Sequence, residues 1–119
     1  MAWRFAADRP VYIQIADRIK KSVLSGQYKA GEQLPTVRQL ALEAAVNPNT
    51  VQRAFTELED EGLIISQGTL GRFVTEDTAV IHAVRKDMAL ELTEAFTKEM
   101  DQLSVNHEQI IELIREVLV

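Results

Sequence analysis

The side chains best suited to chemistry lie in the stretch from Asn47 to Phe55, NPNTVQRAF, which places amide, hydroxyl and guanidinium groups within two turns of an expected helix. Asn and Gln can bond adenine bidentately, Arg can bond guanine, and Thr can reach a phosphate or a thymine methyl group. Outside the apolar stripe that begins at Val51 lie Asn49, Thr50, Gln52 and Arg53. This division predicts a surface that reads base pairs. The alternative is an ordinary solvated helix face with a good cap.

Other chemistry finds little support in the sequence. The chain has no cysteine, which excludes disulfides, thiolate nucleophiles and Cys-based zinc sites. His82 and His107 fall on different expected helices and are typical of surface residues, so we expect no metal and no cofactor. The carboxylates before Gly62 indicate a solvated helix end, and no nucleophile motif or phosphate loop accompanies them. We therefore expect no enzyme activity.

The elements that would position the polar stretch can be read from its flanks. Pro10 favours the start of a helix that ends near Gly26. A short helix should follow with Thr36 as its N-cap, and a third should begin with Asn47 as N-cap and Pro48 at its first position. Residues 63–67 and 72–75 are rich in β-formers and flank a glycine-containing tip, which predicts a hairpin. Three helices and a two-stranded wing predict a mostly α fold, a winged helix-turn-helix over residues 1–75.

The tail, residues 76–119, shows a different pattern. Apolar residues recur at three- and four-residue steps from about Thr78 to Leu103, which predicts a long amphipathic helix. Asn106 is a plausible N-cap for a last helix, with Gln109 completing a capping box. Nothing else in the chain is large enough to cover this stripe, which predicts a two-helix homodimerisation region. Its expected contacts are Ile81, Val84, Met88, Leu92, Phe96, Met100, Leu103, Ile110, Ile114 and Val117.

Charge separates the two regions as well. The net charge of −5 is unevenly distributed, because residues 1–75 carry nine basic and eight acidic residues and the tail carries four and ten. Hydrophobic residues make up 46% and charged residues 26%, as in a soluble globular protein. No apolar run approaches the roughly 20 residues that span a bilayer. We therefore expect a cytoplasmic protein with no membrane partner.

Several motifs mark residues 10–75: Tyr12-x-Gln14-Ile15, Leu34-Pro35-Thr36-x-Arg38-x-Leu40-Ala41, Asn49-Thr50-Val51-x-x-Ala54, Leu58-x-x-x-Gly62-Leu63-Ile64 and Gly71-x-Phe73-Val74. This gapless segment closely resembles the DNA-binding domain of the GntR family of bacterial transcription regulators. The resemblance implies DNA contacts from the second helix, the front of the third and the wing tip, at Thr36, Arg38, Asn47, Asn49, Thr50, Gln52, Arg53, Gln67, Gly68 and Thr69. Pro48 and Thr69 depart from the family pattern, and both bear on base preference.

The short tail resembles the dimerisation module of the YtrA-type subfamily, since larger sensor domains of the family need well over 100 residues. The resemblance implies a repressor that binds an inverted-repeat operator as a homodimer. The operon that such a repressor controls often includes transporter genes. An unidentified small-molecule effector, held between the tail helices, is a further hypothesis.

Two alternatives stay open at this point. The tail could pack against the winged-helix domain of its own chain (residues 1–75, the head) and form part of the core of a monomer. The whole chain could instead be a winged-helix module for protein–protein interaction with little DNA affinity, with the acidic tail docking on a partner.

Overall fold

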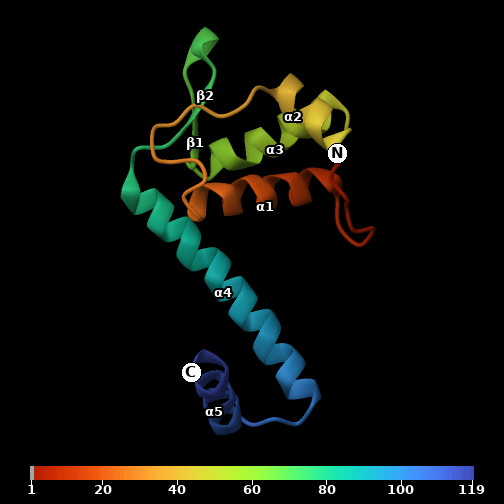
Figure 1. Cartoon of the computed structure of the whole chain (residues 1–119), viewed down its shortest axis with the longest axis vertical. Helices are drawn as coiled ribbons and strands as arrows, with labels where there is room; N and C mark the ends of the chain where they lie inside the picture. The colour runs from red at the N-terminus through yellow and green to blue at the C-terminus, as the bar shows by residue number, and fades with distance from the viewer. Residues whose placement is uncertain (1) are drawn as a thin grey trace. The chain divides into compact units, whose positions relative to one another are not determined.

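The structure, a computed structural model, describes residues 2–119. The chain forms two compact units, the first reaching to Val84 and the second spanning Arg85–Val119. In order along the chain, the elements are α1 (Val11–Leu24), α2 (Val37–Ala44), α3 (Pro48–Asp60), β1 (Ile64–Ser66), a 3-10 turn (Gly68–Leu70), β2 (Arg72–Val74), α4 (Thr78–Gln102) and α5 (His107–Leu118) (Figure 1). The expected mostly α fold with a small sheet is confirmed.

The helices of the first unit begin where their caps predict. Thr36 Oγ1 accepts a hydrogen bond from the Gln39 amide, while Gln39 Oε1 accepts one from the Thr36 amide, which forms a complete capping box for α2. Asn47 caps α3, with Pro48 at its first position. Pro10 lies at the N-cap of α1 and not inside it. Each helix therefore starts within a residue or so of its sequence signal.

The wing is a short antiparallel hairpin whose register pairs Ile64 with Val74 and Ser66 with Arg72. Its strands are shorter than expected, and a 3-10 turn forms the tip. The segment before α2 pairs with the outer side of β2. Gln33 forms an antiparallel bridge with Phe73, and the Leu34 amide donates a hydrogen bond to the Arg72 carbonyl at 2.8 Å. The loop that leads into α2 is thus attached to the wing.

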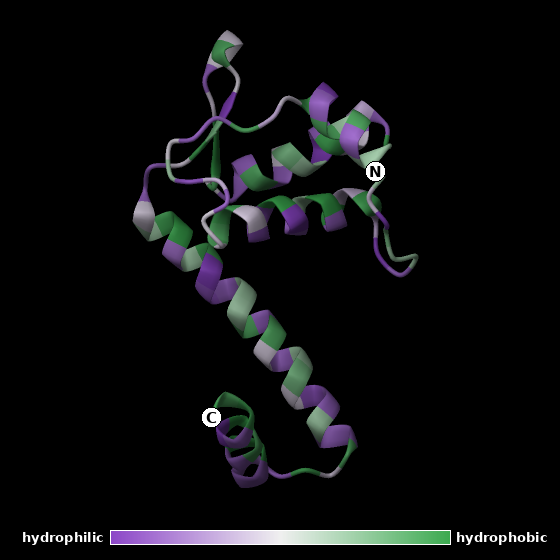
Figure 2. Ribbon diagram, in the orientation of Figure 1, coloured by the Kyte–Doolittle hydropathy of each residue, from purple (hydrophilic) through white to green (hydrophobic). Residues whose placement is uncertain are grey.

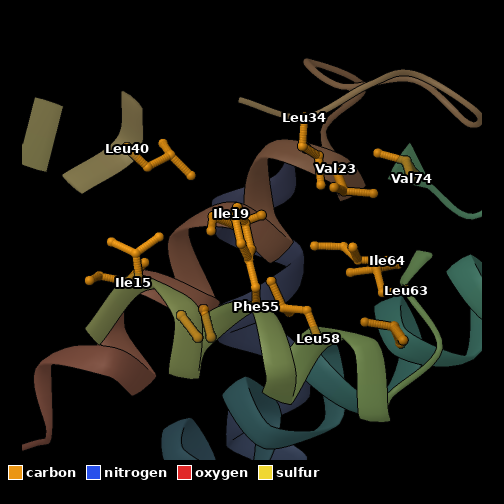
Figure 3. Close-up of a cluster of buried hydrophobic side chains, with 14 of the residues drawn as sticks. Ile15, Ile19, Val23, Leu34, Leu40, Phe55, Leu58, Leu63, Ile64 and Val74 are labelled. Atoms are coloured by element: carbon orange, nitrogen blue, oxygen red, sulfur yellow. The ribbon is translucent and has the colours of Figure 1, made fainter. Parts of the chain in front are cut away.

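One apolar core holds the first unit together. Figure 3 shows side chains from α1, α2, α3 and the hairpin converging on Phe55, which is completely buried. Trp3 and Phe5 of the N-terminal segment are partly buried and pack against this core. Burial of a side chain the size of Phe or Leu stabilises a fold by about 1.5–3 kcal/mol. This shared core fixes α3 against α1 and α2.

The first unit also includes the start of α4, beyond the expected boundary after Thr75. Val84 is buried in the core cluster, and Val80 and Ile81 are half-buried against it. The first two turns of α4 therefore act as part of the winged-helix core. Ile81 and Val84, which we expected in a dimer interface, pack against this core, and their place in a dimer interface stays a prediction.

The second unit consists of the rest of α4 and α5. Asn106 Oδ1 accepts from the Gln109 amide at 2.9 Å, and Gln109 returns the bond, so the expected capping box is present. Ile110 is buried, and its role as a dimer contact stays a prediction. Leu90, an apolar residue of α4 outside the expected stripe, is also exposed. Hydrophobic and hydrophilic segments alternate along α4 (Figure 2). Among the described residues, no helix is long and apolar enough to cross a membrane.

Candidate DNA-binding surface

The front of α3 divides as the sequence predicts. Val51, Ala54, Phe55 and Leu58 are buried, whereas Asn47, Asn49, Gln52 and Arg53 are exposed and Thr50 is half-buried. The first turn of α3 carries no acidic side chain, so nothing there repels a phosphate. A helix held by one apolar side with its polar N-terminal turns exposed can enter a major groove.

Asn47 is the N-cap of α3. Its Oδ1 accepts a hydrogen bond from the Asn49 amide at 2.8 Å, and its carbonyl accepts one from the Thr50 amide at 3.0 Å. Pro48 has no amide hydrogen to offer. The N-terminal amides of α3 are thus largely satisfied within the helix, which leaves recognition by α3 to its side chains.

Arg53 does not extend freely into solvent. Its guanidinium carbon lies 3.9 Å from the centroid of the Tyr12 ring, in a cation–π stack that joins α3 to the first turn of α1. Tyr12, Val11, Asn49, Thr50 and Arg53 line a shallow hollow between the two helices. The structure therefore brings three of the expected contacts together with a residue that the sequence analysis had only quoted as part of a motif.

The two DNA contacts expected at the start of α2, Thr36 and Arg38, differ in whether their side chains are already hydrogen-bonded within the protein. Thr36 is committed to its capping box, and its hydroxyl accepts from the Gln39 amide at 3.1 Å. Arg38 lies two residues further along, in the first turn of α2, and is exposed. Thr36 also lines a second hollow with Gln33 and Gln39. Arg38 is therefore the charged group that α2 can offer to a phosphate or a base.

The wing tip carries the remaining expected contacts, Gln67, Gly68 and Thr69, all of them exposed. Gln33 holds this tip from the side, because its Nε2 donates to the Leu70 carbonyl at 2.8 Å. At the end of β2 next to the tip, Arg72 Nε donates to Glu59 Oε1 of α3 at 2.6 Å. The wing is thus tied both to the loop before α2 and to the end of α3.

Sequence reasoning missed Tyr12 and Gln33 as parts of this surface. Both partners, Arg53 and Leu70, lie far along the chain, so no local spacing signals either contact. Within the described residues, no cluster of three or more His, Asp or Glu side chains could hold a metal ion. The site is a set of polar side chains on a rigid scaffold.

Comparison with known proteins places this surface in a family. The family described as "Bacterial regulatory proteins, gntR family" matches residues 11–74. The chain is 32% identical to the HTH-type transcriptional regulator YhcF of Bacillus subtilis over 94% of its own length and 93% of that protein's length. It is 34% identical to the HTH-type transcriptional repressor YtrA of the same organism, over 91% of this chain and 84% of YtrA.

A solved structure agrees over nearly the whole chain. The GntR family transcriptional regulator from Listeria monocytogenes has a TM-score of 0.87 and 39% identity to this chain, with 94% of this chain and 98% of that one covered. These relatives are transcription regulators and not enzymes, as the sequence led us to expect. The chain belongs to the GntR family of bacterial regulatory proteins and is a DNA-binding transcription regulator.

Proposed function

We propose that this protein is a repressor that binds an inverted-repeat operator as a homodimer. The observation that carries the proposal is the exposed row of Asn49, Gln52 and Arg53 on a helix whose opposite side is locked into the core. Amide groups at that place are the donors and acceptors that distinguish base pairs in the major groove, and the guanidinium beside them can contact a base edge or a phosphate. Arg38 and the wing tip supply further contacts beside it.

The second unit supports the homodimer. It exposes large apolar side chains on both of its helices and on the turn between them: Leu90, Leu92, Leu103, Ile111, Leu113, Ile114, Val117 and Leu118. Figure 2 shows green, hydrophobic segments on both α4 and α5. Many exposed large apolar side chains on a small unit mark an interface. A second copy of the chain would cover it and place two α3 helices on symmetric half-sites.

Seven of the expected dimer contacts lie in the second unit with side chains that are not fully buried. Leu92, Leu103, Ile114 and Val117 are exposed, and Met88, Phe96 and Met100 are half-buried. The small number of basic residues in the first unit, nine against ten acidic ones, adds a reason for pairing. One head can neutralise few phosphates and should bind weakly, whereas a tethered pair gains from effective concentration.

Repression is proposed because of the likeness to YtrA, which is named as a repressor. Control of an operon with transporter genes is proposed from the resemblance to the YtrA-type subfamily alone. Both follow from relatives that share nearly the whole chain, including the short tail.

Selection of binders from a random-sequence DNA pool tests the proposal directly. It should be run at about 150 mM salt, where non-specific phosphate attraction is weak. We expect the full chain to enrich an inverted repeat and the Arg38→Ala, Gln52→Ala double variant to lose that enrichment. Lys98→Ala, Lys86→Ala is the matched control, because it removes two exposed basic groups from the second unit. If the folded full chain enriched no sequence, the protein–protein interaction module would become the better account.

A further inference from the structure

The Tyr12–Arg53 stack constrains what Arg53 can contact. A guanidinium is planar, so its face can lie on an aromatic ring while the N–H groups at its edge stay available for hydrogen bonds. Here the face is used, with the guanidinium carbon 3.9 Å from the ring centroid. The ring belongs to the first turn of α1, so Arg53 is directed toward the junction of α1 and α3. Gln52, its neighbour in the chain, is exposed on α3.

The junction suits a small anion. Arg53 lines the hollow there together with Asn49, Thr50 and Tyr12, three residues whose side chains carry amide or hydroxyl groups. Neither α1 nor α3 carries an acidic side chain in its first turn. Among the described residues, no side chain caps α1, so the positive end of its dipole also faces this side. Three helix-derived features therefore favour negative charge at one place.

We propose that this hollow binds one phosphate of the DNA backbone, with Arg53 as the cation and Tyr12 as the residue that positions it. The proposal rests on the proposed function and assigns roles within it. Arg53 fixes the protein on the duplex and carries no sequence information, whereas Gln52 reads a base edge. Tyr12 improves binding by holding the guanidinium in place before DNA arrives, which reduces the entropy that binding must remove.

Salt dependence separates a phosphate contact from a base contact. Each phosphate contact contributes about 0.9 to the slope of log K against log salt, so a two-fold dimer that loses the Arg53 contact should lose about 1.8. Affinity for the selected operator and for an unrelated duplex should fall by the same factor. The relative preference among single-base operator variants should stay unchanged.

The experiment measures operator and unrelated-duplex binding by fluorescence anisotropy over about 50 to 300 mM salt, for the full chain and matched variants. Arg53→Ala tests the cation, Tyr12→Leu the ring, and Tyr12→Phe keeps the ring while removing the hydroxyl. The controls are Arg18→Ala and Trp3→Leu, since Arg18 lies 3.9 Å over the Trp3 ring in an equivalent stack that is outside the hollow. Circular dichroism melts establish that each variant is folded.

We expect Arg53→Ala to reduce the slope and both affinities, Tyr12→Leu to do so partly, and Tyr12→Phe to retain most binding. Tyr12→Leu should add nothing in the Arg53→Ala background, because its effect acts through Arg53. The two control variants should keep the wild-type slope.

Two results would overturn the proposal. An Arg53→Ala variant with an unchanged slope and a changed base preference would make Arg53 a base reader. Independent, additive losses from Tyr12→Leu and Arg53→Ala would remove the positioning role of Tyr12. Absence of any duplex binding by the folded wild-type chain is a distinct outcome, since it would overturn the proposed function as well.

Discussion

Gly71 shows how a single residue maintains the wing. Its backbone has φ +112° and ψ −158°, a region almost restricted to glycine, and an added Cβ would lie 2.9 Å from Gln33 Nε2. We predict that Gly71→Ala lowers the free energy of unfolding by about 1–3 kcal/mol and loosens the Gln33 contact with the tip. Urea denaturation and amide hydrogen exchange at Leu70 would measure the two effects.

Gly68→Ala is the matched control. Gly68 has φ +55° and no atom within 4 Å of an added Cβ, so only the milder left-handed penalty of about 1 kcal/mol applies. A Gly71→Ala variant no less stable than Gly68→Ala would contradict this view of the wing tip.

For single residues, the sequence predicts the role of a side chain correctly where that role depends only on neighbouring residues. Asn47 and Pro48 begin α3 as expected, because cap and first-turn preferences involve neighbouring residues only. The exposure of Gln52 and Arg53 also follows from helical periodicity. The stack of Arg53 on Tyr12 could not be predicted, since it depends on how α1 and α3 pack.

The start of α2 depends on Thr36, a residue for which the sequence predicts two roles. Thr36 caps α2 through its hydroxyl and was also expected to contact DNA. We predict that Thr36→Ala lowers the free energy of unfolding by about 1 kcal/mol, because the Gln39 amide loses its acceptor. Thermal melts of Thr36→Ala and Thr36→Ser would measure this, and the serine variant should stay close to wild type.

The same two variants distinguish the capping role of Thr36 from a direct contact between Thr36 and DNA. If Thr36 acts on DNA only by ordering α2, Thr36→Ser should bind operator as the wild type does. A serine variant with wild-type stability and much weaker operator binding would instead indicate that the threonine methyl group touches DNA.

Element ends were predictable where the chain uses common signals and unpredictable elsewhere. The capping boxes of α2 and α5 are both present where the sequence places them. In contrast, α2 ends at Ala45 in the left-handed conformation, φ +58°, which few non-glycine residues adopt. The wing strands are shorter than their β-forming residues suggest, because the 3-10 turn takes up the tip. Packing decides such ends, and propensity does not.

For the whole molecule, the sequence placed a boundary where the helical pattern changes, after Thr75. Periodicity alone cannot show which partner covers an apolar helix face, so the start of α4 was assigned to the tail. In the structure, the first unit reaches to Val84. This difference changes how the two units should be separated in an experiment.

We predict that a chain ending at Val84 folds as a stable head and that a chain ending at Asp77 is clearly less stable. The longer head keeps the contacts of Val80, Ile81 and Val84 with the core, and the shorter one exposes the surface beneath them. Full burial of one such side chain contributes about 1.5–3 kcal/mol, so these three, two of them only partly buried, should together contribute at least about 2 kcal/mol. Urea denaturation of the two truncated chains measures the difference.

The head ending at Val84 then allows the dimer to be tested without a folding defect. Sedimentation should show the full chain as a dimer and this head as a monomer, because the exposed apolar residues of α5 and most of α4 are absent from it. Its operator affinity should fall by at least tenfold, since each half-site then binds without a tethered partner. A head that matched the full chain in affinity would contradict dimer-dependent binding. Equal stability of the two truncated chains would contradict the assignment of the start of α4 to the winged-helix core.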